Sequence, residues 1–234
     1  MNKLVKEFFQ KYQINISDAQ SLQFQKFYEL LVSENEKYNL TSITEKNDVA
    51  LKHFLDCCLC ENEFSKNATV CDMGSGAGFP AIPLIIMRPD LKFTLVDSNA
   101  KKINFLKLVV VELNLQNIEV VNCRAEDFAH LAKFREHFDF ATARAVSETA
   151  VLVELLIPLL KIGGKAILLK SVKINEEIEK AKNALICLNS KIEKIKNYKI
   201  KEIDAERNIL VIKKEKSTTG KYPRKNGIPS KNPL

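Results

Sequence analysis

Three glycines at alternate positions, which follow an acidic residue, constrain the fold and the ligand of this chain more than any other feature. Residues 69–80 read Thr-Val-Cys-Asp-Met-Gly-Ser-Gly-Ala-Gly-Phe-Pro, so an apolar run meets Asp72 and is followed by Gly74, Gly76 and Gly78. Glycine is needed where the backbone takes a positive φ or approaches a ligand with no Cβ in the way. The pattern predicts a strand, a tight turn and a helix start, whose free N–H groups can bind a polar ligand.

The register of the glycines narrows the class of ligand. Counted from Gly74, the third glycine of the dinucleotide fingerprint G-x-G-x-x-G would fall at Phe79, and no Gly-Lys-Ser/Thr follows as a P-loop requires. The pattern D-x-G-x-G-x-G resembles motif I of S-adenosylmethionine (SAM)-dependent methyltransferases. A second acid, Asp97, ends the next apolar run and can accept the two hydroxyls of a ribose. We therefore predict a SAM site between Gly74 and Asp97.

Composition limits the compartment and the metal chemistry. The chain has 234 residues, 46% of them hydrophobic, but no apolar run long enough for a membrane span and no signal-peptide pattern. We therefore expect a cytoplasmic protein with reduced cysteines. The residues His53, Cys57 and Cys60 share one helix face at a spacing that zinc ligands can have, but without a C-x-x-C pair we interpret them as core packing and expect no metal.

The net charge of +7 is unevenly distributed along the chain. Residues 1–160 carry more acidic than basic side chains, whereas residues 161–234 are strongly basic and residues 216–234 contain no acid at all. A basic segment on a neutral-to-acidic body indicates a polyanionic partner such as nucleic acid. A solvated, lysine-rich surface is the alternative, and we prefer it for the helical stretch 173–201 but not for the tail.

Periodicity predicts three regions. Residues 1–66 form an N-terminal helical lobe packed on the core, and residues 67–215 alternate strands and helices. Residues 216–234 form a basic C-terminal strap. The expected fold class is α/β, with a seven-stranded, mostly parallel sheet, an antiparallel last strand and the helical lobe. This arrangement resembles the Rossmann-like class I SAM-dependent methyltransferases. Its strands are expected at residues 68–72, 92–97, 117–122, 137–143, 164–170, 190–200 and 207–213.

Polar residues after the third and fourth strands extend the predicted site. Ligands of open α/β sheets bind outside the carboxyl ends of the strands. Arg124, Ala125 and Glu126 follow strand three, and Arg144 ends strand four. Ala125 and Glu126 can offer a backbone N–H and a carboxylate to an adenine. Arg124 and Arg144 lie where an anionic substrate would arrive, although surface ion pairs are an equally ordinary role for such arginines.

Several segments together resemble one family. Tyr-Asn-Leu-Thr at 38–41, Lys-His-Phe-Leu-Asp at 52–56, the glycine motif, Arg-Ala-Glu at 124–126, Ala-Arg-Ala at 143–145 and the terminal K-Y-P-R-K-N-G-I-P-S-K-N-P-L at 221–234 are similar to motifs of the RsmG (GidB) family. The family methylates guanine N7 in bacterial small-subunit (16S) ribosomal RNA. Ala81 departs from the glycine usual there, and Cys57 from a serine.

The resemblance implies site residues and partners. It implies SAM contacts at Gly74, Phe79, Ala125, Glu126 and Arg144, to which the residue patterns add Gly76, Gly78 and Asp97. It implies ribosomal RNA or the small ribosomal subunit as partner, and we expect a monomer without membrane attachment. The candidate RNA-binding residues are, in chain order, His53, Arg124, Arg144, Lys221, Arg224, Lys225 and Lys231, of which the last four belong to the proline-stiffened strap.

The implied reaction passes the SAM methyl group to guanine N7 by in-line displacement. N7 carries a lone pair and no proton, so no general base is required and no catalytic residue is named. Three alternatives remain: a methyltransferase for a small molecule or protein, a non-enzymatic RNA-binding protein, and a nicotinamide dehydrogenase. Steep salt dependence would argue against the first, SAM binding would exclude the second, and the glycine register disfavours the third.

Overall fold

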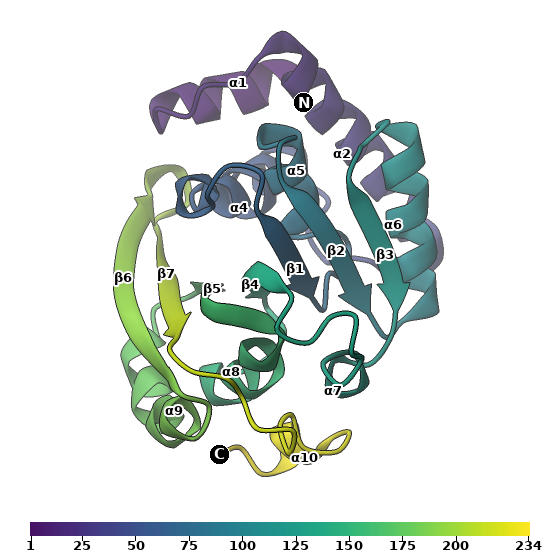
Figure 1. The fold of residues 1–234 in the computed structure, drawn as a ribbon. Helices are drawn as coiled ribbons and strands as arrows, with labels where there is room; N and C mark the ends of the chain where they lie inside the picture. Colours follow the sequence, from purple (N-terminus) through teal and green to yellow (C-terminus); the bar gives the residue numbers. More distant parts are fainter.

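A single seven-stranded sheet runs through the molecule, with strand order β3-β2-β1-β4-β5-β7-β6. The computed structural model describes residues 1–234 (Figure 1). Strands β1 to β5 pair in parallel, and β7 pairs antiparallel with both β5 and β6. The strands are β1 Thr69–Met73, β2 Lys92–Asp97, β3 Ile118–Asn122, β4 Phe138–Arg144, β5 Leu160–Lys170, β6 Ser190–Ile200 and β7 Ala205–Lys214. The predicted α/β class, with an antiparallel pair ending the sheet, is confirmed.

Helices connect the strands and precede them. The first group contains α1 Asn2–Lys11, α2 Asp18–Tyr38, α3 Lys46–Asp48, the π-helical η1 Val49–Leu55, α4 Asp56–Cys58 and η2 Glu61–Glu63. The second contains α5 Ala81–Met87, α6 Ala100–Glu112, α7 Ala125–Phe128, α8 Thr149–Leu156, η3 Ile157–Leu159, α9 Ile174–Cys187, η4 Lys201–Ile203 and α10 Ile228–Lys231. The helix after β3, α7, is short, and the C-terminal strap contains the short helix α10.

Two apolar cores lie on opposite faces of the sheet. One contains side chains of α1, α2, α5 and α6 against strand residues such as Val70 and Leu95. The other contains side chains of α7, α8 and α9 against residues such as Cys71 and Val96, and it also includes Tyr222 of the tail. Neighbours along β1 and β2 enter different cores because successive strand side chains point to opposite faces. The N-terminal helices therefore share a core with the sheet, while the division into three regions stays a prediction.

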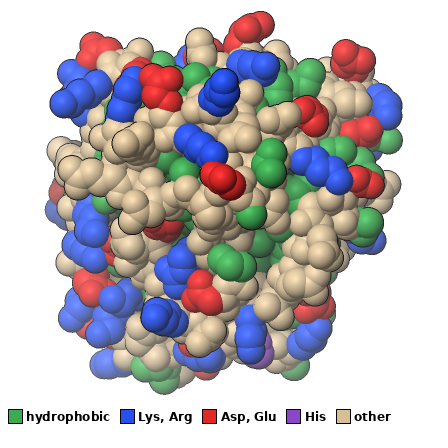
Figure 2. Space-filling model, turned by 90° about the horizontal axis from the view of Figure 1, so that it is seen from above, with side chains coloured by type: hydrophobic (Ala, Val, Ile, Leu, Met, Phe, Trp, Pro, Cys, Tyr) green, Lys and Arg blue, Asp and Glu red, His purple; other side chains and the backbone are tan.

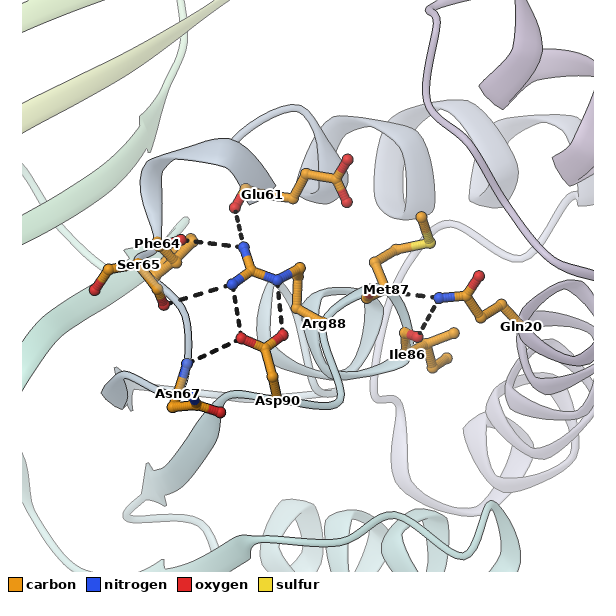
Figure 3. A network of polar contacts seen from close by, with 9 residues as sticks. All are labelled: Gln20, Glu61, Phe64, Ser65, Asn67, Ile86, Met87, Arg88 and Asp90. Carbon is orange, nitrogen blue, oxygen red and sulfur yellow. Dashed lines mark hydrogen bonds and ion pairs between the residues drawn. The ribbon is translucent and has the colours of Figure 1, made fainter.

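Polar contacts tie the N-terminal helices to the end of α5 (Figure 3). The guanidinium of Arg88 donates to the carbonyl oxygens of Glu61, Phe64 and Ser65 and pairs with Asp90 at 2.8 Å. Gln20, part of the capping box that begins α2, donates to the carbonyls of Ile86 and Met87. These carbonyls at the end of α5 would otherwise lack partners, so the contacts fix α2 and the segment before β1 against the sheet.

The carboxyl ends of β1, β2 and β3 point away from α1, toward α7 and α10 (Figure 1). The face on the α1 side carries interspersed basic and acidic side chains rather than a cluster of one sign (Figure 2). A polyanion gains little from such a mixed surface because attraction and repulsion offset each other. A ligand site is therefore expected at the opposite edge, where the strands end.

Candidate functional site

The turn between β1 and α5 has the backbone that its glycines predict. Gly74, Gly76 and Gly78 have φ values of 72°, 56° and 91°. The N–H groups of Gly74 and Ser75 donate to the carbonyl of Val96 at 2.8 and 3.1 Å, which ties the turn to β2. A Cβ on Gly74 would lie 2.7 Å from Cγ2 of Val146. The turn is therefore held close to the end of β4 in a shape that other residues would not adopt.

Asp97 joins the two loops that form the mouth of the site. One carboxylate oxygen accepts the N–H of Gly76 at 2.9 Å, and the other accepts the N–H of Asn99 at 2.8 Å. A carboxylate has about four lone-pair positions, so each oxygen can still accept a further hydrogen bond. The carboxylate thus holds the glycine turn in place and keeps acceptor capacity for the hydroxyl groups of a ribose.

A cavity of about 350 Å³ opens between these loops and α7. Four of the predicted cofactor residues line it: Gly74, Asp97, Ala125 and Glu126. The lining also includes residues that were not predicted as cofactor contacts, namely Met73, Val96, Ser98, Lys102, Cys123, Ala145, Val146, Leu155 and Ser230. We call this space the cofactor pocket. Arg124 lines it too, with an exposed side chain whose Nε lies 4.0 Å from Glu126.

Four other predicted cofactor residues do not line this pocket. Gly76 and Gly78 belong to the glycine-rich turn beside the pocket, where both have a positive φ. The ring of Phe79 is buried and stacks on His53, with ring centroids 4.2 Å apart. The side chain of Arg144 lines a neighbouring cavity instead. Cofactor contacts by these residues stay predictions.

Asp72 provides a test of whether the site suits SAM. Its carboxyl is fully buried, and neither oxygen has a hydrogen-bond partner. Burial, reinforced by the charge of nearby Asp97, raises the pKa of Asp72 to about 7. A buried carboxyl without a partner is costly, and an adjacent cation would relieve that cost. SAM carries a sulfonium and an ammonium group, so the residues present fit this cofactor.

A second cavity, of about 440 Å³, adjoins the cofactor pocket at Ala145, which lines both. We call it the polar pocket; its lining comprises Ile43, His53, Asp56, Arg144, Ala145, Ser147, Leu169, Lys170, Ser171, Glu177 and Arg207. Ala145 has a φ of 56°, in the left-handed region that alanine rarely occupies. Arg144, just before Ala145, lines the polar pocket, and Val146, just after it, lies against Gly74 of the glycine turn. Strained residues of this kind occur preferentially at functional sites.

The guanidinium of Arg144 is surrounded by partners from the chain. Nε donates to Oδ2 of Asp56 at 3.0 Å, and Nη2 forms an ion pair with the same oxygen at 2.9 Å. Nη1 donates to Nδ1 of His53 at 3.2 Å, and Nη2 donates to the carbonyl of Lys52. Because arginine can only donate, Nδ1 of His53 is an acceptor and Nε2 carries the proton that faces Thr41, 3.1 Å away. Burial, together with the charge of Arg144, lowers the pKa of His53 to about 4. His53 is therefore neutral at pH 7.

The C-terminal strap folds back over the same edge. The guanidinium of Arg224 pairs with the fully buried carboxylate of Glu154 at 2.7 Å, and the N–H of Gly227 donates to Glu126 at 2.8 Å. Arg224 is thus engaged by partners within the protein, and its contact with RNA stays a prediction. Lys221, Lys225 and Lys231 are exposed and form no ion pair. The strap therefore provides both a wall of the cofactor pocket and free cations beside it.

Sequence reasoning missed several residues of this site. Asp56 lies in a quoted motif, yet its pairing with Arg144 depends on packing. Arg207, Lys170 and Glu177 belong to segments read only as strands or helices, and no local pattern distinguishes them.

The three cysteines Cys57, Cys58 and Cys60 are buried, and no group of three or more His, Cys, Asp or Glu side chains is placed to hold a metal. No helix is long and apolar enough to cross a membrane.

Comparisons with known proteins agree with this geometry. The family model for GidB, rRNA small subunit methyltransferase G, matches residues 20–210. The ribosomal RNA small subunit methyltransferase G of Exiguobacterium sibiricum is 45% identical over 223 residues, and that of Streptococcus gordonii is 48% identical over 227 residues; each alignment covers 94% of both chains.

Solved structures extend the fold comparison. M. jannaschii TYW2 in complex with AdoMet (SAM) superposes with a TM-score of 0.54 at 18% identity, over 74% of this chain and 77% of that one. A SAM-dependent methyltransferase from Aquifex aeolicus gives 0.54 at 17% identity, over 77% of this chain and 97% of that one. The fold is thus that of class I SAM-dependent methyltransferases. The chain belongs to the rRNA small subunit methyltransferase G (GidB) family and is a SAM-dependent methyltransferase.

Proposed function

We propose that this enzyme methylates N7 of a guanine in small-subunit (16S) ribosomal RNA, and that it does so as a monomer in the cytoplasm. One observation carries the proposal: the cofactor pocket meets, at Ala145, a polar pocket lined by two arginines. A nucleotide held in the polar pocket would therefore lie beside the bound cofactor. Exposed lysines of the strap flank the same edge, where they can contact the phosphates of a longer RNA.

The residues of the site bind and orient rather than exchange protons. SAM, when bound, supplies the methyl group. Gly74, Asp97, Ala125 and Glu126 line the pocket that would hold it. The buried carboxyl of Asp72 lies behind the turn, and a bound cation would favour its ionised form. Guanine N7 has a free lone pair at neutral pH, so the protein needs only to hold it in line with the methyl group. Both ring nitrogens of His53 are engaged, which suits a supporting role.

The candidate RNA-binding residues divide into two groups. Arg124, Lys221, Lys225 and Lys231 are exposed and can contact phosphates directly. His53 and Arg144 are held by partners inside the protein and support the polar pocket. Arg224 secures the strap. Direct contacts of the first group predict RNA binding that weakens steeply with salt, whereas turnover of a small neutral substrate would not.

Mass spectrometry of ribosomal RNA tests the proposal. We expect a strain that lacks this protein to lose one 7-methylguanosine from its small-subunit RNA, and the purified enzyme with SAM to restore it. Supplying naked RNA and assembled subunits in parallel reactions identifies the substrate form. An unchanged 7-methylguanosine pattern in the deletion strain would overturn the proposal.

A further inference from the structure

The carboxylate of Asp56 binds two arginines that come from different strands. Oδ2 accepts from Nε of Arg144 at 3.0 Å and lies 2.9 Å from Nη2, and Oδ1 lies 3.2 Å from Nε of Arg207. The side chain of Asp56 is only 5% exposed. Arg144 ends β4 and Arg207 lies near the start of β7, with β5 between these strands. A residue of α4 thus holds two guanidinium groups on one wall of the polar pocket.

The two guanidinium groups differ in the donors they have left. Every nitrogen of Arg144 has a partner in the chain. Arg207 uses Nε for Asp56 and Nη1 for the carbonyl of Glu206, whereas Nη2 forms no hydrogen bond within the chain. Arg144 is therefore a fixed support, and Arg207 keeps a donor for a ligand. Because arginine is flexible, the direction of that donor depends on the carboxylate that holds Nε.

The charges of the polar pocket do not cancel. Asp56 offsets one of the two arginines, and Lys170 pairs with Glu177 at 2.6 Å. His53 is neutral at pH 7, as its environment requires. One positive charge thus remains on the wall that holds Arg207. A guanidinium matches the geometry of phosphate oxygens and binds them with charge-assisted hydrogen bonds.

We propose that Asp56 is a positioning residue for methyl transfer, which holds Arg144 and Arg207 so that Arg207 receives a phosphate of the target nucleotide. The inference rests on the proposed function, since the phosphate is that of the RNA substrate. Asp56 does not contact the reacting atoms. It sets the place of the nucleotide relative to the cofactor pocket, and a misplacement of about 1 Å can lower a rate by about 100-fold.

The variant Asp56→Asn separates positioning from simple charge attraction. It removes a negative charge from the pocket, so attraction alone predicts RNA binding as tight as that of the wild type or tighter. Loss of positioning predicts a less efficient reaction with RNA. We expect kcat/KM for small-subunit RNA at saturating SAM to fall about 10- to 100-fold, with SAM affinity unchanged. An unchanged or increased kcat/KM would overturn the inference.

Two further variants keep the test decisive. Asp56→Glu retains the charge but moves the carboxylate by one methylene; positioning predicts a lowered kcat/KM, and a wild-type value would count against it. Because this variant keeps both ion-pair partners, it decides the matter if Asp56→Asn does not fold. Glu63 is the matched control, since its carboxylate, also 5% exposed, binds Lys194 and Lys196 away from the pocket. We expect Glu63→Gln to lower stability without changing kcat/KM.

The wild-type reaction distinguishes this inference from the proposed function. If wild-type enzyme transfers no labelled methyl group from SAM to small-subunit RNA, the proposed function itself fails. If the wild type is active and both Asp56 variants match it, only the positioning role fails.

Discussion

The imidazole ring of His53 stacks on the phenyl ring of Phe79, with centroids 4.2 Å apart and planes inclined by 24°. Phe79 belongs to the glycine-rich turn, and His53 to the helical segment that precedes the sheet. The contact links the glycine-rich turn to the polar pocket, because His53 lines that pocket and also accepts from Arg144. The predicted N-terminal lobe thus contributes a wall to the site.

Acid should destabilise the protein through His53. Its pKa is about 4 in the folded protein against 6.5 for a free histidine, so between these values the unfolded chain takes up a proton that the folded protein excludes. The free energy of unfolding should therefore fall as pH drops from about 6.5 to about 4, by up to about 3 kcal/mol from this residue. Urea denaturation at pH 7.5, 5.5 and 4.5 measures the change.

The variant His53→Gln isolates that contribution, because glutamine does not titrate. Its loss of stability between pH 7.5 and 4.5 should be smaller than that of the wild type. His137→Gln, at an exposed histidine, should keep the wild-type dependence. Parallel curves for wild type and His53→Gln would contradict the prediction.

SAM binding should strengthen as pH rises through about 7. The pKa of Asp72 is raised from 3.8 to about 7, so the carboxyl is partly protonated near neutral pH. Above pH 7 the carboxyl is ionised, and its burial then lowers the stability of the cofactor-free protein most. A cationic cofactor favours the ionised form, and binding should release a proton. Calorimetry at pH 6 and pH 8, in buffers with different ionisation enthalpies, measures both effects. Asp72→Asn should weaken binding at pH 8 and remove the pH dependence; a wild-type affinity that does not change with pH would refute this.

Three glycine-to-alanine variants separate backbone strain from steric clash. Gly78 has a φ of 91°, and an added Cβ would lie 2.6 Å from Cγ1 of Ile82. Gly163 has a similar φ of 85° but open space around it, and Gly220 has open space without a positive φ. We expect Gly220→Ala to be neutral, Gly163→Ala to cost about 1 kcal/mol and Gly78→Ala to cost more, up to about 3 kcal/mol. Thermal unfolding gives the order, which equal losses at Gly78 and Gly163 would disprove.

Arg224 should stabilise the strap rather than bind RNA. Arg224→Ala removes the guanidinium from the buried carboxylate of Glu154, which then keeps only the backbone N–H of residue 224 as a partner. The free energy of unfolding should fall by about 3 kcal/mol because a buried charge loses its counter-ion. Limited proteolysis should then cleave within residues 216–234 sooner. Lys225→Ala removes an exposed, unpaired charge and is the matched control: its melting temperature should stay unchanged, while the slope of log K for RNA against log[salt] decreases by about 1. A stable Arg224→Ala with weakened RNA binding would reverse the assignment.

The sequence alone determined the fold class and the cofactor. Alternation of apolar runs and helical segments indicated the parallel sheet, and the bounds of β2 and β6 agree with the predicted 92–97 and 190–200. The glycine register and Asp97 indicated SAM because both effects are local: a turn needs positive φ at set positions, and a strand end sets where an acid lies. The family motifs added the RNA.

Tertiary structure decided where the long side chains go. Arg144, Arg207 and Asp56 meet because β4, β7 and α4 pack at one edge, and Arg224 reaches Glu154 because the strap folds back over α8. Such pairings depend on the distance between elements that lie far apart in the sequence. The local sequence around a charged residue does not distinguish a side chain that faces solvent from one that pairs with a buried partner. The glycine-rich turn could therefore be predicted residue by residue, whereas the polar pocket beside it could not.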